Sequence, residues 1–271
     1  MSAPALGFTP GQAAVLGAVQ GLTEFLPVSS SAHLFIVPHL LGWRYEGLAF
    51  DVALHAGTLI ALLVAFWRDW WNLARDTFAP DSAARTEARR LWLWIIVATI
   101  PGAVVGMLLE RAAEDRLRSM ELQATMLLVF GFILWAVDHF RGPGKEVRRP
   151  GWMMALWIGL AQVLALVPGV SRSGITITAG RAASLTRVSA ARLSFMLATP
   201  ITLGAVLLKA KDLPADLPAG SLAVGVITSA LVGLLAIRGL LRWLSRAGFG
   251  VFFAYRAAVA LLIFGVSWLR P

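Results

Sequence analysis

The stretch QGLTEFLPVSSSAH, residues 20–33, gathers a carboxylate, three serines and a histidine around one proline inside an apolar segment. Proline removes a backbone donor and serine offers competing hydrogen bonds, so a helix that enters this stretch should stop there. The stretch PGVSRSGIT, residues 168–176, interrupts a second apolar segment in the same way. Irregular backbone at membrane depth is tolerated where it lines a wet cavity or is buried in protein. We therefore interpret both stretches as the turns of re-entrant helical hairpins.

The composition is that of an integral membrane protein. Of the 271 residues, 58% are hydrophobic and 14% are charged, whereas soluble domains carry about 25% charged residues. A helix needs about 20 apolar residues to cross a bilayer core, and six segments approach or exceed that length: 48–67, 91–110, 122–140, 191–209, 220–237 and 249–269. The sequence predicts an all-α polytopic protein, a single membrane domain over 1–271, with six transmembrane helices and two re-entrant hairpins.

The chain also repeats itself at a spacing of 142 residues. This shift aligns four pairs of residues: Gly17 with Gly159, Gln20 with Gln162, Ser29 with Ser171, and Ser31 with Ser173. Each half, 13–140 and 152–269, contains one hairpin and three spans, and an odd number of spans inserts the second copy upside down. Inverted repeats with broken helices are typical of membrane proteins that bind ligands near the midplane. Chance similarity between apolar segments is the alternative interpretation.

The net charge of +9 is interpreted as a signal of membrane orientation and not of nucleic-acid binding. If the connection 68–90 lies in the cytoplasm, cytoplasmic connections carry about twice as many Lys and Arg residues as outer ones. Both termini then lie outside the cytoplasm, and the first hairpin enters from the outer face. The chain has no cysteine, so disulfides and thiolate metal sites are excluded. The N-terminus lacks the basic region of a signal peptide.

Glu24 is the first candidate functional residue. A carboxylate at membrane depth costs roughly 2.5–3.5 kcal/mol on insertion unless it faces a polar cavity or a partner. Gln20 lies four residues earlier on the same helix face, and the two side chains predict a site for a hydrated cation or a bound water. A structural ion pair between Glu24 and an arginine is the alternative.

Three serines after the first proline form a second group of candidates: Ser29, Ser30 and Ser31. Serine is a common N-cap, and a helix N-terminus presents free N–H groups and a favourable dipole to an anion. The hydroxyl of Ser30 is expected to attack or hold a phosphoryl group. His33 follows Ser30 at the spacing of a nucleophile and its base on one helix face; a structural histidine is the alternative.

Arg172 is the main candidate of the second half. Its planar fork of donors suits phosphate oxygens, and in the repeat it stands in place of Ser30. The two hairpin turns would therefore bring a hydroxyl and a guanidinium to one point. Further substrate-binding hydroxyl donors are expected from Ser171, Ser173 and Thr176.

Three further polar residues lie in apolar segments, but their sequence context is less specific for a function. Arg256 lies deep in the last predicted span and is expected either to bind the anion or to join a structural salt bridge. Asp51 and His55 begin the span that follows the first hairpin and are candidates to line the same cavity.

The two interrupted stretches, together with FDVALHAGT at residues 50–58, resemble the signature motifs of the undecaprenyl-pyrophosphate phosphatase family of the bacitracin-resistance type. The resemblance covers essentially the whole chain. It implies a bacterial inner-membrane enzyme that converts the C55 isoprenyl diphosphate to its monophosphate and recycles this carrier for peptidoglycan synthesis. The active site would open to the periplasmic side.

The resemblance also implies roles for individual residues. Glu24 belongs to the acidic motif, Ser30 and His33 form the serine–histidine part, and Arg172 is the phosphate-binding arginine. The implied cofactor is a divalent cation, Mg²⁺ or Ca²⁺. The acidic motif often reads Glu-x-x-x-Glu, whereas this chain has Gln20 at the first position, so the cation is expected on Glu24, Gln20 and substrate oxygens.

Two other functions were compared with this one. An inverted-repeat lipid flippase or secondary transporter is the alternative, because broken helices and a polar midplane suit that class equally well. A lipid phosphatase of the acid-phosphatase type is excluded, because it requires a late histidine and none follows His139. The expected partners are a polyprenyl diphosphate and membrane lipids, and a homodimer is compatible with the sequence. The attacking group, a serine or a water, is left open.

Overall fold

The fold is a bundle of helices. The computed structural model describes residues 8–43, 45, 47–115, 119–147, 151–213 and 217–269, and these ranges contain no strand beyond one isolated bridge. The helices are α1 (Pro10–Phe25), α2 (Ser30–Leu41), α3 (Leu48–Ala65), α4 (Trp67–Thr77), α5 (Ser82–Asp115), α6 (Met120–Phe140), α7 (Trp152–Val163), η1 (Leu164–Leu166), α8 (Arg172–Ala182), α9 (Arg187–Lys209), η2 (Ala210–Asp212), α10 (Ala219–Leu244) and α11 (Gly250–Leu269). The predicted all-α class is confirmed.

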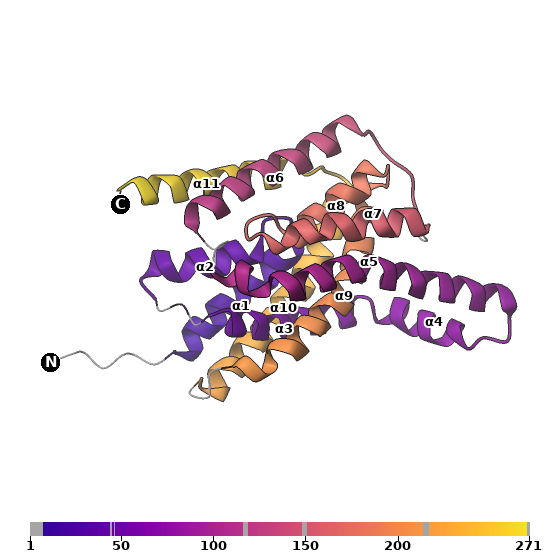
Figure 1. The fold of residues 1–271 in the computed structure, drawn as a ribbon, viewed down its shortest axis with the longest axis horizontal. Helices are drawn as coiled ribbons and strands as arrows, with labels where there is room; N and C mark the ends of the chain where they lie inside the picture. Colours follow the sequence, from indigo (N-terminus) through magenta and orange to yellow (C-terminus); the bar gives the residue numbers. More distant parts are fainter. Residues whose placement is uncertain are drawn as a thin grey trace.

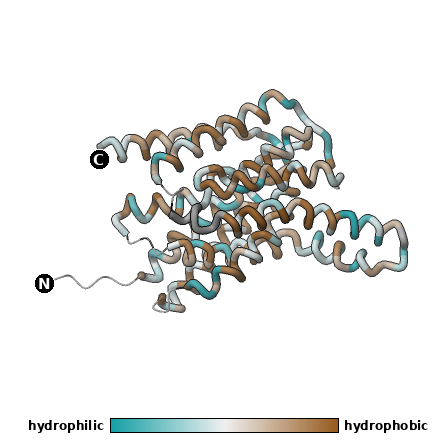
Figure 2. Tube along the Cα trace, viewed as in Figure 1, coloured by the Kyte–Doolittle hydropathy of each residue, from teal (hydrophilic) through white to brown (hydrophobic). Residues whose placement is uncertain are grey.

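Six helical segments are long and apolar enough to cross a membrane, and they match the six predicted spans. They belong to α3, α5, α6, α9, α10 and α11. Figure 2 shows that hydrophobic residues fill the middle of the bundle, while hydrophilic ones gather in several of the connections. The connection 68–90 is itself helical, because α4 and the first turns of α5 form a pair that projects beyond the other helices (Figure 1). The chain is therefore a multi-pass membrane protein.

The two interrupted stretches separate α1 from α2 and α7 from α8. Each of these four helices has 16 residues or fewer, too short for a full crossing, which needs about 20. The breaks lie where the sequence predicted them. The re-entrant path of each pair through a membrane remains a prediction.

Each half of the chain packs against a helix of the other half. Helix α1 lies along α10, and α7 lies along α5. The aligned glycines make these contacts: a Cβ on Gly159 would lie 2.7 Å from the Ala98 carbonyl oxygen, and a Cβ on Gly17 would overlap the backbone of Gly225. A repeat requires such matched contacts, although the inverted insertion of the two halves remains a prediction.

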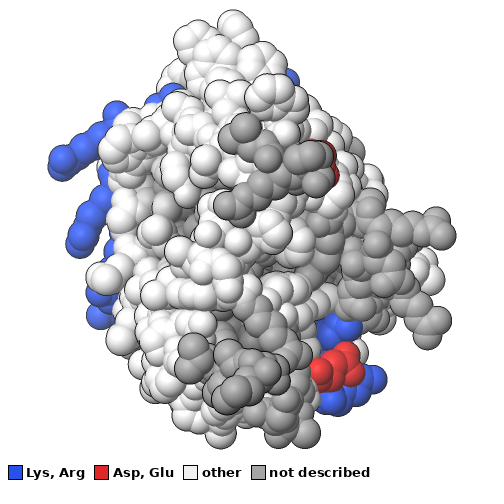
Figure 3. Space-filling model, turned by 90° about the vertical axis from the view of Figure 1, so that its left-hand side faces the viewer, with Lys and Arg blue, Asp and Glu red and all other residues white. Residues whose placement is uncertain are grey.

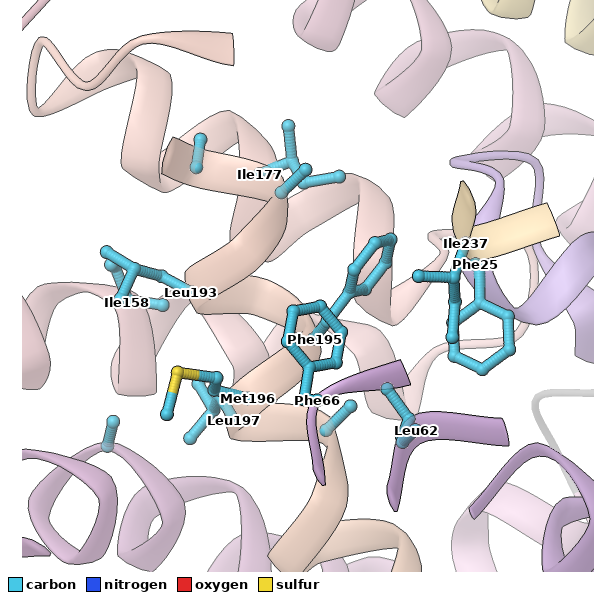
Figure 4. Packing of buried hydrophobic residues seen from close by; sticks show 14 of the residues in the cluster. Phe25, Leu62, Phe66, Ile158, Ile177, Leu193, Phe195, Met196, Leu197 and Ile237 are labelled. Carbon is cyan, nitrogen blue, oxygen red and sulfur yellow. The ribbon is translucent and has the colours of Figure 1, made fainter. Parts of the chain in front are cut away.

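The end of α1 is fixed to α9 by aromatic packing (Figure 4). The ring of Phe195 meets Phe25 edge-on, with centroids 5.4 Å apart, and also contacts Phe66 at 6.1 Å. All three side chains are almost fully buried. Since Phe25 directly follows Glu24, this packing holds the carboxylate in a constant position relative to α9.

The start of α1 and the end of α11 lie at the same end of the molecule (Figure 1), as the even number of predicted spans requires. Figure 3 views this end, where most described atoms are neither acidic nor basic and the Lys and Arg side chains lie at the rim. At the end of α8, Arg181 and Arg187 share the buried carboxylate of Asp138 at 2.8 Å each. This cluster ties α6, α8 and α9 together.

Candidate active site

A cavity of about 260 Å³ lies where the two interrupted stretches meet. We define the first tip as residues 26–31 and the second tip as residues 167–173. The polar wall of the cavity comes mainly from these tips and from the end of α1: Glu24, Ser29, Ser30, Ser31, Ser171 and Arg172. The apolar and small lining residues, which we call the apolar wall, come from α5, α9 and the segment after α7: Gly102, Ala165, Leu166, Ile201 and Ala205. Three further polar residues complete the lining: His55, Gln162 and Thr202. The cavity lining therefore contains both polar groups and apolar side chains.

The two tips have nearly the same backbone. Ser29 has φ 74° and Ser171 has φ 75°, and each residue directly precedes a helix, α2 or α8. Non-glycine residues rarely adopt such angles, which cost of order 1–3 kcal/mol and are concentrated at functional sites. In each tip the serine hydroxyl lies 3.2 Å from the hydroxyl two residues later, Ser31 or Ser173. The alignment predicted from the sequence is thus visible in the local geometry.

Glu24 is the centre of the polar wall. Its side chain is 6% exposed, and its Oε1 pairs with Arg172 Nη2 at 2.5 Å. Its Oε2 accepts hydrogen bonds from the Ser30 hydroxyl at 2.6 Å and from Gln20 Nε2 at 3.2 Å. The carboxylate thus joins the end of α1 to both tips. The alternative interpretation of Glu24, an ion pair with an arginine, is therefore met by Arg172. The same carboxylate also lines the cavity.

Arg172 lines the cavity from the first residue of α8. One guanidinium nitrogen, Nη2, is paired with Glu24, and the other, Nη1, is buried without a hydrogen-bond partner in the described part of the chain. A buried charged donor without an acceptor is costly. The guanidinium therefore keeps one nitrogen without an acceptor in a residue that lines the cavity.

The predicted pair of Ser30 and His33 is not formed. Ser30 bonds to Glu24, whereas His33 Nδ1 lies 2.7 Å from the Ser29 carbonyl oxygen and Nε2 lies 2.8 Å from the Tyr255 hydroxyl. The i,i+3 spacing places two residues on one helix face but does not decide their tertiary partners. In this geometry the group next to the serine hydroxyl is the carboxylate.

His55 enters the site instead. It lines the cavity, as the sequence suggested, with its side chain 23% exposed and Nε2 lying 3.4 Å from Glu24 Oε2. Its Nδ1 lies 2.7 Å from the Asp51 carbonyl oxygen. No sequence pattern pairs His55 with Glu24, because the two residues lie on different helices and meet only in the folded chain.

Gln162 is a cavity residue that the sequence analysis used only to align the repeat. It is 2% exposed, and its amide nitrogen lies 3.5 Å from the Ala98 carbonyl oxygen. In the sequence, only its alignment with Gln20 could have indicated that Gln162 lies at the cavity.

The remaining predicted serine and threonine donors divide into two groups. Ser29, Ser31 and Ser171 line the cavity as expected. Ser173 and Thr176 bond elsewhere: the Ser173 hydroxyl donates to the Leu26 carbonyl oxygen at 3.3 Å, and Thr176 Oγ1 lies 2.7 Å from Ser194 Oγ. Both hydroxyls bond to protein atoms and neither residue belongs to the described cavity wall, so their contact with an anion stays a prediction.

Arg256 forms no salt bridge with the described residues, which corrects that expectation, and it is not part of the described cavity wall, so its contact with an anion stays a prediction. It is fully buried and donates to five backbone carbonyl oxygens, those of Pro27, Met126, Leu127, Gly169 and Val170. Three of these carbonyls belong to the tips, where the helix breaks leave oxygens without intrahelical partners. Arg256 therefore fastens the two tips together from behind the cavity.

The site has few ligands for a metal ion. Among the described residues, no three His, Cys, Asp or Glu side chains converge as a metal-binding group. The Glu24 carboxylate is the only acidic group in the described cavity wall. Beside it, the amide oxygen of Gln20 is buried and has no hydrogen-bond partner within the described ranges. Gln20 is not part of the described cavity wall, and its amide nitrogen is the atom that faces Glu24, so the predicted pair of metal ligands stays a prediction.

Comparison with known proteins gives a consistent picture. The family described as bacitracin resistance protein BacA matches residues 13–262. A protein of Gemmatimonas aurantiaca named undecaprenyl-diphosphatase is 48% identical over 263 residues, which is 94% of this chain and 97% of that protein. Proteins of the same name from Pelotomaculum thermopropionicum and Desulforudis audaxviator are 47% and 46% identical, each over 96% of this chain and over 97% and 99% of their own lengths.

Proposed function

The chain belongs to the bacitracin resistance protein BacA family, and we propose that it hydrolyses undecaprenyl diphosphate to the monophosphate and inorganic phosphate. The observation that carries this proposal is the Arg172 guanidinium, which has one nitrogen unpaired in a cavity where the Ser30 hydroxyl bonds to Glu24. The name shared by the three relatives supports the same reaction. The product would return the lipid carrier to peptidoglycan synthesis, and its recycling would confer resistance to bacitracin.

The two tips would bind the diphosphate through complementary groups. A guanidinium presents donors in the geometry of phosphate oxygens. The first turns of α2 and α8 add backbone N–H groups and the positive ends of two helix dipoles. In phosphoryl transfer the transition state spreads charge over the equatorial oxygens of the transferred group and develops charge on the leaving oxygen, and donors placed at these oxygens would stabilise it.

Ser30 and Glu24 would carry out the transfer. The serine hydroxyl lies 2.6 Å from Glu24 Oε2, within reach for the carboxylate to accept the proton that the hydroxyl loses on attack. The Oγ–P bond would form as the bond from the terminal phosphorus to the bridging oxygen breaks, and water would then release phosphate from the serine. A water on Glu24 that attacks the terminal phosphorus directly gives the same products.

A divalent cation, Mg²⁺ or Ca²⁺, would be held by Glu24 and by the amide oxygen of Gln20. Carboxylate and amide oxygens are the ligands that these ions prefer in proteins. The ion would neutralise charge on the substrate phosphates when bound. The Gln20 amide nitrogen faces Glu24 Oε2 at 3.2 Å, so the amide would rotate to present its unpartnered oxygen to the ion.

The lipid part of the substrate would leave the cavity along its apolar wall. Leu166, Ile201 and Ala205 form part of this wall, and an isoprenyl chain needs only apolar contacts. We infer from the Lys and Arg bias of the connections that the cavity opens to the periplasmic side of the inner membrane. A homodimer is a further proposal, which chemical cross-linking in native membranes would test.

Phosphate release tests the proposed function. Purified protein in detergent should release one phosphate per undecaprenyl diphosphate, and a chelator should suppress the release. Acid quenching during turnover with terminally labelled substrate should trap labelled Ser30 if the serine attacks, and no label if water attacks. Movement of the lipid across liposomes without phosphate release would reject the phosphatase and support the transporter.

A further inference from the structure

The hydrogen bonds of His33 determine which of its ring nitrogens carries a proton. Its Nδ1 lies 2.7 Å from the Ser29 carbonyl oxygen, and a carbonyl only accepts, so Nδ1 bears the hydrogen. In the neutral ring Nε2 has only a lone pair and therefore accepts the hydrogen of the Tyr255 hydroxyl, 2.8 Å away. Both nitrogens are engaged with protein atoms, and the described cavity wall includes Ser29, Ser30 and Ser31 but not His33.

Tyr255 is arranged to hold this ring. Its own ring stacks on the imidazole with an interplanar angle of 9° and a centroid distance of 5.6 Å. It is the neighbour of Arg256 on α11, and Arg256 bonds to the Pro27 carbonyl oxygen at 3.1 Å. Two consecutive residues of α11 thus act on the first tip, one directly and one through His33.

The part of the tip that they hold is strained. Ser29, whose carbonyl oxygen receives the His33 hydrogen bond, has φ 74°. The Ser29 hydroxyl makes no capping hydrogen bond to α2. In the second tip, the Ser171 hydroxyl caps α8 by accepting from the Gly174 N–H at 3.1 Å. A backbone in a sparsely populated region persists only when its surroundings over-determine it. In the first tip, the hydrogen bond from the His33 ring to the Ser29 carbonyl oxygen supports the turn. In the second tip, the Ser171 cap has this role.

We propose that Tyr255 is a positioning residue, which acts through His33 to hold the Ser29 turn so that the Ser30 hydroxyl stays against Glu24. His33 is then a positioning residue as well, and it moves no proton during the reaction. This inference rests on the proposed phosphatase function, because it assigns roles to Tyr255 and His33 beside the proposed active site.

Three variants test the proposal by activity. Tyr255→Phe keeps the stacked ring and removes one hydrogen bond, so kcat should fall about three- to ten-fold, the value of one bond, with KM within two-fold. His33→Asn retains an N–H group to donate to Ser29 but cannot transfer a proton, and it should recover most of the activity that His33→Ala loses. An inactive His33→Asn together with a fully active Tyr255→Phe would overturn the proposal in favour of proton transfer by His33.

A matched control lies on the same helix. The Ser267 hydroxyl also joins α11 to another helix, through Glu121 of α6, but it is twelve residues from Tyr255. Ser267→Ala should leave kcat unchanged. If it lowers kcat as much as Tyr255→Phe, loss of any interhelical bond of α11 explains the effect, and the positioning role is rejected.

A second readout needs no turnover. The chain has four histidines, so the imidazole ¹⁵N signals of His33 can be assigned by their absence in His33→Asn. The proposal predicts a neutral ring protonated on Nδ1, unchanged by inorganic pyrophosphate, with an Nε2 signal that shifts in Tyr255→Phe. Protonation on Nε2 alone, or a change of protonation on adding pyrophosphate, would reject it whether or not the protein is a phosphatase.

Discussion

The two tips share a backbone and differ in chemistry. Ser29 and Ser171 adopt the same positive φ, and each pairs its hydroxyl with the hydroxyl two residues later. Between the paired residues the first tip has Ser30 and the second has Arg172. Two helix starts with the same backbone therefore line one cavity, and they present a hydroxyl at one start and a guanidinium at the other.

The difference extends beyond the tips. A shift of 142 residues aligns Glu24 with Leu166 and His33 with Ile175. Glu24 and Leu166 both line the cavity, one on the polar wall and the other on the apolar wall. Two equivalent positions thus provide the two kinds of surface that a lipid diphosphate requires.

The largest expected effect is the loss of the arginine at the second tip. Arg172→Ala should lower kcat/KM for undecaprenyl diphosphate at least about a thousand-fold, because transition-state charge loses its main cationic partner. Phosphate release by purified protein measures this change. Arg192→Ala is the control, since Arg192 pairs at the surface with Asp69 at 2.9 Å. Near-normal turnover of Arg172→Ala would remove the phosphate-binding role from the second tip.

At the first tip, Glu24→Gln should lower kcat by about a hundred-fold or more, since general acid–base catalysis contributes about 10²–10⁴-fold. The amide preserves the size of the side chain and part of its bonding to Ser30, so the protein should remain folded. Phosphate release at several Mg²⁺ concentrations, with thermal unfolding in detergent, measures both properties. An unchanged requirement for the cation would assign its site to other residues.

The glycines that join the halves should show matched effects on stability. Gly159→Ala places a methyl group 2.7 Å from the Ala98 carbonyl oxygen, and Gly17→Ala overlaps the backbone of Gly225. Each should lower the free energy of unfolding by about 1–3 kcal/mol, as overpacking does. Gly204→Ala has open space around the new methyl group and is the control. If Gly159→Ala lowers the free energy of unfolding and Gly17→Ala does not, the two glycines do not make equivalent contacts.

The smallest expected effect distinguishes the two serines with positive φ. Ser171→Ala removes a helix cap and should lower the free energy of unfolding by about 1 kcal/mol. Ser29 has no cap to lose, so Ser29→Ala should cost less. Thermal unfolding of the two variants tests this order. A larger loss for Ser29→Ala would contradict the claim that the serine hydroxyl caps the helix only in the second tip.

Much of the fold was predictable from the sequence, because apolar length and helix breakers are local signals. The six spans, the two breaks and the convergence of Glu24 and Arg172 on one site required no knowledge of tertiary contacts. The partners of His33 and Arg256 did require it. A buried arginine satisfied by carbonyl oxygens leaves no acidic partner in the sequence to find, and the Tyr255 hydroxyl comes from a helix 222 residues away.

The central claim is that both tips act on one phosphoryl group, and a double-mutant cycle of Ser30→Ala and Arg172→Ala tests it most directly. Residues that act as a unit are strongly non-additive. The kcat/KM of the double variant should therefore be close to that of the more damaged single variant. If the two losses multiply fully, Ser30 and Arg172 act independently, and the account of one site built from two tips is wrong.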